Sequence, residues 1–179
     1  MINKEIERRF LIDYRYRLIN GGTPRWLITQ AYAAISHGTA VRIRKSTFVP
    51  DHKTTYELTG KGNRNGFSND EANIPISAGQ YEAWLTLCSD RVVDKTRETY
   101  HANEVRFDID LFRGRLKPLA IVEVELPSED HPFTPPEWFS DEVTHMLEYA
   151  NASLAVNGLP EHFIHWCVAR DIDLPTTTA

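Results

Sequence analysis

The feature of this sequence that most constrains its fold is a set of short segments in which charged and apolar residues alternate. These segments span residues 5–10, 41–44, 95–97, 107–111 and 122–126. On a β-strand, the side chains of residues i and i+2 point to the same face. Read as strands, the segments therefore each have one charged face and one largely apolar face. The pattern predicts a sheet whose charged residues are gathered on one surface.

The charges on these segments occur as pairs of the same sign. The pairs are Glu5 with Glu7, Glu123 with Glu125, and Arg42 with Arg44. Like charges side by side on a strand repel, so each pair suggests an oppositely charged group between its members. Carboxylates bind divalent metal ions, and Arg or Lys binds phosphate or carboxylate oxygens. A polyphosphate that carries a metal ion is the simplest ligand that needs both.

Two plainer readings of the charged segments remain open from the pattern alone. The charges could face bulk water on a half-exposed sheet. Glu5 and Arg9 could also form an i,i+4 ion pair on an exposed helix, although the apolar run at 10–12 fits a strand better.

The predicted elements are eight mostly antiparallel strands and several helices. Strands are expected at 3–12, 25–34, 39–48, 54–61, 68–76, 91–101, 104–113 and 118–126, and helices at 77–88, 137–144, 146–156 and 160–170. A Gly- and Asn-rich turn is expected at 62–66. Strands of this kind can close into a barrel. The predicted fold class is thus α+β, an eight-stranded antiparallel β-barrel with a charged lumen and helices packed on the outside.

Length and composition bound the class of protein. With 179 residues, 41% of them hydrophobic and 25% charged, the chain suits one globular domain. We expect this domain to span 1–172 and a disordered tail to span 173–179. The net charge of −5 argues against a general nucleic-acid binder. No run approaches the roughly 20 apolar residues of a membrane helix.

The compartment is predicted from the start of the chain and from its cysteines. Met1 leads within four residues into the first charged strand, which leaves no room for a signal peptide. Cys88 and Cys167 are far apart and are expected to be free thiols. Both observations favour a cytoplasmic protein.

The opening run Glu5-Ile6-Glu7-Arg8-Arg9 resembles the Glu-x-Glu-x-Lys start of the CYTH superfamily, also called triphosphate tunnel metalloenzymes. Further blocks follow in the order of that family: Val41-Arg42-Ile43-Arg44, Gly60-Lys61, Asp94-Lys95-Thr96-Arg97, Phe107-Asp108-Ile109-Asp110, and Glu123-Val124-Glu125. The chain looks most like the bacterial single-domain branch with triphosphatase activity. The resemblance implies an eight-stranded tunnel, open along its axis, that holds a triphosphate with Mg²⁺ or Mn²⁺.

The resemblance also implies roles for residues of this chain. The implied catalytic residues are Glu5, Glu7, Arg9, Lys95 and Arg97. The implied phosphate-binding residues are Arg9, Arg42, Arg44, Lys61, Lys95 and Arg97. The implied metal ligands are Glu5, Glu7, Glu71, Asp108, Asp110, Glu123 and Glu125. One metal ion would orient the triphosphate, and a second would position a water for in-line attack on the terminal phosphoryl group.

The chain departs from the family pattern in the lumen. Arg9 stands where Lys is usual, and Thr59 stands where a first Lys of a Lys-Gly-Lys run is common. Asn69 and Asn73 flank Glu71 where the family tends to carry carboxylates. We expect these changes to weaken one metal site or to alter the preferred substrate.

The predicted function is metal-dependent hydrolysis of inorganic triphosphate or a related triphosphate, with a small-molecule substrate and neither nucleic acid nor membrane as partner. The alternatives are an adenylyl cyclase or a thiamine triphosphatase on the same scaffold, and a polyphosphate-binding module without turnover. The oligomeric state stays open, with a homodimer among the alternatives. His162, His165 and Cys167 match no closed zinc site. The last helix is instead expected to close one end of the tunnel.

Overall fold

The computed structural model describes residues 3–15, 24–36, 39–65, 68–102, 105–128 and 130–175. The strands are β1 (Asn3–Leu11), β2 (Arg25–Ser36), β3 (Thr39–Phe48), β4 (Thr54–Asn65), β5 (Ser68–Pro75), β6 (Val92–Ala102), β7 (Val105–Phe112) and β8 (Ala120–Glu125). The helices are α1 (Ala78–Leu87), α2 (Asn151–Asn157) and α3 (Glu161–Val168), and the 3-10 turns are η1 (Gly114–Leu116) and η2 (Leu147–Tyr149).

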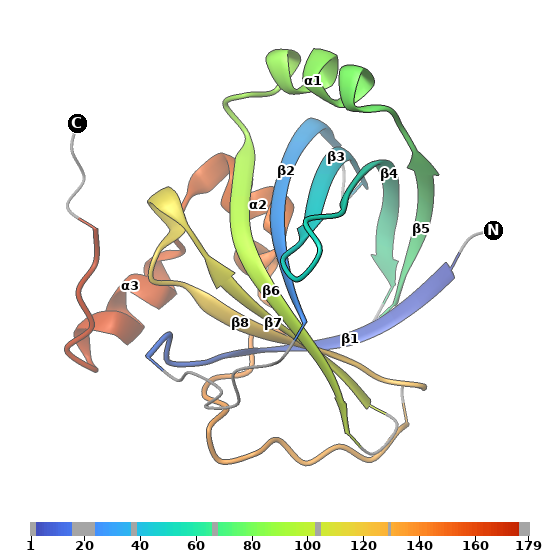
Figure 1. Cartoon of the computed structure of the whole chain (residues 1–179). Coiled ribbons are helices and arrows are strands. Elements are labelled where there is room, and N and C mark those ends of the chain that lie inside the picture. Colours follow the sequence, from blue (N-terminus) through green and yellow to red (C-terminus); the bar gives the residue numbers. More distant parts are fainter. Residues whose placement is uncertain are drawn as a thin grey trace.

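The strands form a closed antiparallel barrel, as the sequence predicts (Figure 1). Their order around the barrel is β1-β5-β4-β3-β2-β6-β7-β8, and β8 pairs back with β1. The pairing of β1 with β8 sets Glu7 opposite Glu125 and Arg9 opposite Glu123. The charged pairs of these two strands are therefore neighbours on one face.

The charged faces point into the barrel and the apolar faces point outward, where other segments cover them. Phe10, Phe107 and Val122 belong to a hydrophobic cluster that is covered by the segment around Phe133 and Phe139. On the β2–β3 side, Ala31 and Ile43 pack against Tyr81 of α1 and against Cys88. The apolar faces are thereby removed from water, which is the main favourable term in folding.

One end of the barrel lumen is apolar and is covered by the C-terminal helices. Leu11 follows the charged positions of β1, whereas Val93 and Ile121 precede those of the antiparallel strands β6 and β8. All three belong to one hydrophobic cluster with Leu154 of α2 and Phe163 of α3. The last helix therefore helps to close this end, as predicted. One of its apolar side chains, Ile164, is nevertheless 37% exposed. The segment that reaches the lumen is η2–α2 rather than α3.

The prediction of a helix at 137–144 is wrong. This segment is extended and forms a β-bridge between Phe10 and Glu142. The backbone N–H of Leu11 donates to the Asp141 carbonyl at 2.9 Å, and the N–H of Val143 donates to the Arg9 carbonyl at 2.8 Å. The physical reason is an open edge, because β5 pairs with β1 only at residues 3–6.

The turn predicted at 62–66 is also displaced. β4 continues to Asn65, with an irregular register between Lys61 and Arg64. The helix predicted at 77–88 is confirmed as α1, and Ser77 and Gln80 form its capping box. Residues 37–38, 66–67, 103–104 and 176–179, which include parts of the predicted turns and tail, lie outside the described residues. Within the described ranges, no helix has the length and apolarity to cross a membrane.

Candidate active site

A cavity of about 880 Å³ occupies the barrel lumen. Among its described lining residues, seven are Arg or Lys and five are Glu: Arg9, Arg42, Arg44, Lys61, Lys95, Arg97 and Arg106, with Glu7, Glu57, Glu71, Glu123 and Glu125. The chain as a whole carries a net charge of −5. The lumen therefore concentrates positive charge in an acidic protein, which favours an anionic ligand.

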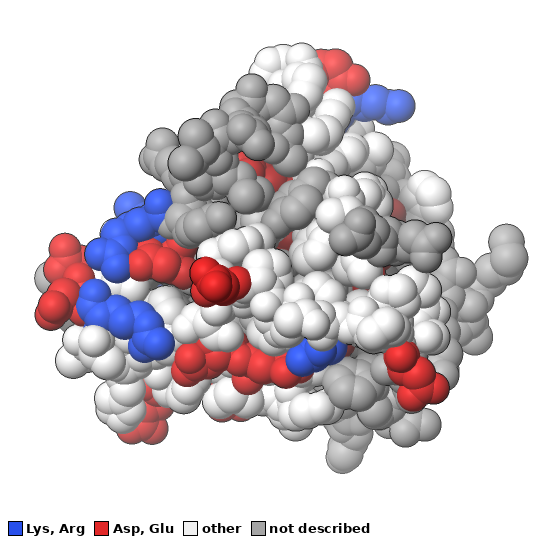
Figure 2. All heavy atoms as spheres, turned by 90° about the horizontal axis from the view of Figure 1, so that it is seen from below, with Lys and Arg blue, Asp and Glu red and all other residues white. Residues whose placement is uncertain are grey.

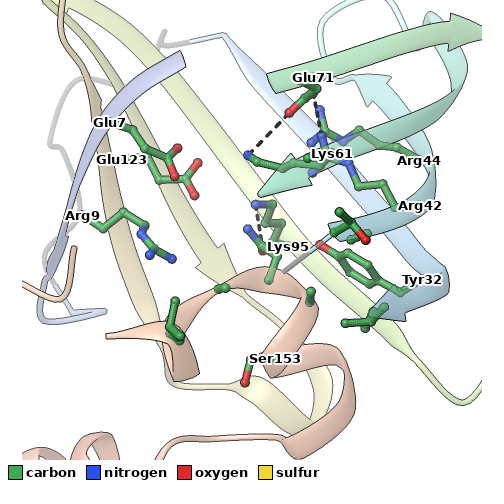
Figure 3. Close-up of a pocket in the computed structure, with 18 of the residues that line it drawn as sticks. Glu7, Arg9, Tyr32, Arg42, Arg44, Lys61, Glu71, Lys95, Glu123 and Ser153 are labelled. Carbon is green, nitrogen blue, oxygen red and sulfur yellow. Dashed lines mark hydrogen bonds and ion pairs between the residues drawn. The ribbon is translucent and has the colours of Figure 1, made fainter. Parts of the chain in front are cut away.

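The basic residues reach the cavity from five strands, β1, β3, β4, β6 and β7 (Figure 3). Arg42 and Arg44 come from β3, and Lys61 comes from β4, beside them. The Nε groups of Arg9, Arg42 and Arg44 are buried and have no hydrogen-bond partner among the described residues. Burial and the nearby cations Arg42 and Arg97 lower the pKa of Arg44 to about 10. This part of the lumen thus has donors and positive charge in excess.

Glu71 joins two of these cations on the wall of the cavity. Its Oε1 accepts a hydrogen bond from Arg42 Nη2 at 3.2 Å, and its Oε2 lies 3.5 Å from Lys61 Nζ. Burial tends to raise the pKa of Glu71, but Arg42 and Lys61 lower it more strongly, so the net direction is down. Glu71 is therefore an ionised carboxylate held between cations.

A second network surrounds Arg97 on the β6–β7–β8 wall. Arg97 donates to Asp108 at 2.7 Å, to Asp110 at 2.6 Å and to Glu123. Lys95 Nζ donates to Asp110 at 2.6 Å. Asp108 and Asp110 are fully buried behind these cations and are not among the residues that line the cavity. In this arrangement they orient Arg97 and Lys95.

Lys95 is the most buried cation of the lumen, with 1% of its surface exposed. Burial lowers its pKa to about 8, against the opposing effect of Asp110. Its Nζ also donates to Asn151 Oδ1 of α2 at 3.2 Å. Lys95 is therefore held between the barrel wall and the helix that reaches the lumen.

Only some of the carboxylates that were predicted to bind metal face the cavity. Glu7 and Glu123 lie side by side and face the cavity (Figure 3). Glu125 lines it too and lies 3.3 Å from Arg106. The side chain of Glu5 lies outside the described residues. Among the side chains described, no three or more acidic, His or Cys groups converge as metal ligands.

Two carboxylates are nevertheless enough for the expected type of metal. Mg²⁺ keeps several waters and is commonly bound through one or two carboxylates together with substrate phosphates. The oxygen donors of Glu7 and Glu123 fit Mg²⁺ or Mn²⁺ in this way. Burial would raise the pKa of Glu123, but Arg97 and Lys95 lower it strongly, so this carboxylate is ionised as a ligand must be.

Sequence reasoning left Tyr32 unplaced and gave no role to Asn151, although both line the cavity. Tyr32 is buried, and its hydroxyl accepts a hydrogen bond from Gln30 Nε2 at 3.0 Å. The signal was present, because Tyr32 and Gln30 alternate with small or apolar residues on β2. His162, for which the sequence predicted no zinc site, contacts Tyr149 instead: its Nδ1 lies 2.6 Å from the Tyr149 hydroxyl.

The outer surface differs from the lumen. On the face seen from below, acidic and basic side chains are interspersed (Figure 2). Uncharged residues cover most of the described part of that face, and a band of acidic side chains runs along its lower part.

Comparison with known proteins gives two relatives that match most of the chain. An inorganic triphosphatase of Nitrosomonas europaea is 34% identical over 157 residues, which cover 86% of this chain and 97% of the relative. An inorganic triphosphatase of Acetivibrio thermocellus is 32% identical over 158 residues, which cover 87% and 96%. The chain belongs to this inorganic triphosphatase family.

Solved structures agree with the family assignment. A crystal structure of an inorganic triphosphatase matches with a TM-score of 0.64 and 32% identity, over 89% of this chain and 98% of that one. A putative adenylate cyclase from Bacillus halodurans shares the fold, with a TM-score of 0.50 and 15% identity over 98% of this chain and 95% of that one. These neighbours support the resemblance of this triphosphatase family member to the CYTH superfamily. No family model matches the chain.

Proposed function

We propose that this protein, as a member of the single-domain branch of the CYTH superfamily, hydrolyses inorganic triphosphate with the help of Mg²⁺ or Mn²⁺ and releases phosphate. The observation that carries the proposal is the group of buried Nε donors of Arg9, Arg42 and Arg44, which have no hydrogen-bond partner among the described residues. Buried polar groups are normally hydrogen-bonded. A triphosphate supplies many acceptor oxygens and the negative charge that these donors need.

Binding is assigned to the wall formed by β1, β3 and β4. Arg42 and Arg44 offer planar donor pairs that match phosphate oxygens. Lys61 adds a movable point charge on the same side of the cavity. The Tyr32 hydroxyl accepts from Gln30, so its own proton is available for a phosphate oxygen.

The metal is assigned to the wall formed by β1 and β8. Glu7 and Glu123 would hold it, with phosphate oxygens and water as its other ligands. When bound, Mg²⁺ or Mn²⁺ neutralises phosphate charge and lowers the pKa of a water for attack. The proximity of Arg9 to Glu123, which pair across β1 and β8, keeps substrate and metal sites adjacent.

The remaining cations act on the charge that moves during phosphoryl transfer. Arg97 and Lys95 are fixed by buried carboxylates, so little reorganisation is needed when charge shifts toward the leaving oxygen. Preorganised donors in a water-poor site are the largest contribution to such reactions. No nucleophilic side chain is required.

A second candidate function is hydrolysis of an organic triphosphate. Three apolar side chains at one end of the cavity, those of Ile35, Leu147 and Val156, are 40% to 70% exposed. They could contact an organic group attached to the phosphate chain, as a thiamine or nucleoside triphosphate would require. The names of the relatives favour the inorganic substrate.

Phosphate release tests the proposal. Purified protein is given tripolyphosphate, ATP or thiamine triphosphate, each with Mg²⁺, Mn²⁺ or a chelator. We expect metal-dependent release that is fastest with tripolyphosphate and is lost in Glu7→Gln and Glu123→Gln. Glu82→Gln, on the exposed face of α1, is the control and should keep full activity. Preference for an organic substrate would select the second candidate.

Binding without release would give a different conclusion. If no substrate releases phosphate, while tripolyphosphate raises the melting temperature, the protein is a polyphosphate-binding module and the proposed hydrolysis is wrong.

A further inference from the structure

Two uncharged residues of the lumen wall, Thr59 and Asn73, face each other across β4 and β5. Thr59 is fully buried, and its Oγ1 donates a hydrogen bond to Asn73 Oδ1 at 2.7 Å. Asn73 lies at the cavity surface and is exposed to it. On its other side, Thr59 pairs with Arg42 of β3. The two residues thus connect the strand that carries Glu71 with the strand that carries Arg42.

The Asn73 amide is held at both ends, by Thr59 at its oxygen and by Glu71 at its nitrogen. Because Oδ1 accepts from the hydroxyl, the NH₂ group faces Glu71, and Nδ2 donates to Glu71 Oε1 at 3.1 Å. The opposite amide orientation would set a carbonyl oxygen against a carboxylate. Glu71, which only accepts, therefore sets the amide orientation, and the hydrogen bond from Thr59 holds the amide oxygen in place.

Glu71 transmits this orientation to the cations. The oxygen that accepts from Asn73 also accepts from Arg42 Nη2, and the second oxygen lies near Lys61 Nζ. Because Glu71 is only 6% exposed, few other groups are available to bind its carboxylate. Rotation of this carboxylate would move the ion-pair contacts of Arg42 and Lys61 together.

We infer that Thr59 and Asn73 are positioning residues, which orient Glu71 and through it hold Arg42 and Lys61 in place for the phosphate chain. This inference rests on the proposed function for the identity of the ligand. It gives the chain's departures from the family pattern a role, because a neutral hydrogen-bonded pair replaces charged residues. It also assigns Glu71 to substrate binding rather than to the metal.

The test compares binding and turnover in four variants: Thr59→Val, Thr59→Ser, Asn73→Leu and the double variant Thr59→Val/Asn73→Leu. The dissociation constant of tripolyphosphate is measured by calorimetry with a chelator present, and kcat, KM and the half-saturating Mg²⁺ concentration are measured by phosphate release. Thr55→Val, on the same strand but outside the cavity lining, is the matched control.

One hydrogen bond to a charged group is worth about a tenfold change in affinity. We expect binding to weaken about tenfold in Asn73→Leu and about threefold to tenfold in Thr59→Val. Thr59→Ser, which keeps the hydroxyl, should restore binding to within about twofold of wild type. The double variant should bind no worse than Asn73→Leu, because Thr59 acts through Asn73.

KM should rise with the dissociation constant, while kcat and the half-saturating Mg²⁺ concentration stay within about twofold. The inference is overturned if Thr59→Val binds like wild type. It is also overturned if the double variant loses the product of the two single effects, or if the variants shift the Mg²⁺ requirement and leave tripolyphosphate binding unchanged.

Two further outcomes separate this inference from the proposed function. Binding by wild type without turnover rejects the proposed hydrolysis, and the calorimetric comparison still decides the role of Thr59 and Asn73. Absence of binding by wild type rejects both. If Thr59→Val fails to fold by its melting curve, Asn73→Leu at the cavity surface decides alone, and unchanged binding there overturns the inference.

Discussion

Single residues of the lumen are placed for binding at the expense of stability. Arg44 shows this most clearly, because its Nε has no hydrogen-bond partner in the part of the chain that the structure describes and the cations Arg42 and Arg97 lie near it. A cation whose pKa is lowered by burial costs folding free energy while it stays charged. A stability cost at a binding site is expected where function selects the residue.

Replacement of Arg44 should therefore separate stability from function. We expect Arg44→Gln to raise the free energy of unfolding by about 1–3 kcal/mol and to weaken tripolyphosphate binding at least tenfold. Urea unfolding and calorimetry measure the two effects. Arg15→Gln, which replaces an exposed arginine paired with Asp13, should leave both stability and binding unchanged. Loss of stability in Arg44→Gln would contradict the account.

Lys95 predicts a pH dependence of binding. Its pKa is lowered to about 8 in the folded protein, so part of the population has lost the proton above pH 8. A bound triphosphate favours the charged ammonium and should raise this pKa. Binding at pH 8 to 9 should therefore take up a proton and weaken as the pH rises.

Calorimetry in buffers of different ionisation enthalpy measures this uptake, with a chelator present to prevent turnover. Lys95→Arg, which stays charged, should show no uptake from this position. Equal proton uptake in wild type and in Lys95→Arg would show that another group is responsible.

The lowered pKa of Lys95 also makes the stability of the folded protein depend on pH. Between pH 8 and the ordinary lysine pKa, the unfolded chain binds the proton more tightly than the folded one, so the Lys95 contribution should raise stability with increasing pH in that window.

At the scale of elements, α2 has a double role as part of the core and as part of the cavity wall. Leu154 is fully buried in the cluster that closes one end of the barrel, while Val156 of the same helix is 53% exposed. Asn151, at the start of α2, accepts from Lys95. Core packing of this short helix therefore positions a group of the active site.

Leu154→Ala should lower the free energy of unfolding by about 2–5 kcal/mol, because it leaves a cavity in the core. Val156→Ala, the control on the same helix, should cost less than about 0.5 kcal/mol. Thermal and urea unfolding measure both changes. Similar losses in the two variants would show that α2 does not pack as described.

Alternation of charge predicted the strands and their inward faces, since it is a local property of each strand. It could not predict the extended path of 137–144, because that path depends on the free edge of β1 beside Phe10. Nor could it pair Thr59 with Asn73, or place Asp108 and Asp110 behind Arg97. These contacts depend on barrel register and on which residues compete for one cation.

At the scale of the whole molecule, closure of the barrel converts a list of charged strands into one binding site. The chain is acidic overall, and the described lining of the cavity is basic. The barrel closes by pairing β8 with β1, which brings Glu7 and Glu123 together from distant parts of the sequence. The proposed metal and phosphate sites therefore depend on the pairing of β8 with β1.

The buried thiols test the global packing. Burial raises the pKa of Cys167 to about 11 and raises that of Cys88, so little reactive thiolate is present at pH 8. We expect both thiols to react slowly with a disulfide reagent in the native protein and fully in denaturant. Rapid reaction of either thiol in the native state would contradict the packing of α1 or α3.

The most direct measurement is a crystal structure of the wild-type protein with Mn²⁺ and a non-hydrolysable imido analogue of tripolyphosphate, using the anomalous signal of manganese to locate the metal. The account predicts the phosphate chain in the lumen against Arg9, Arg42 and Arg44, with manganese at Glu7 and Glu123. A phosphate chain bound outside the barrel, or manganese bound at Glu71, would contradict it.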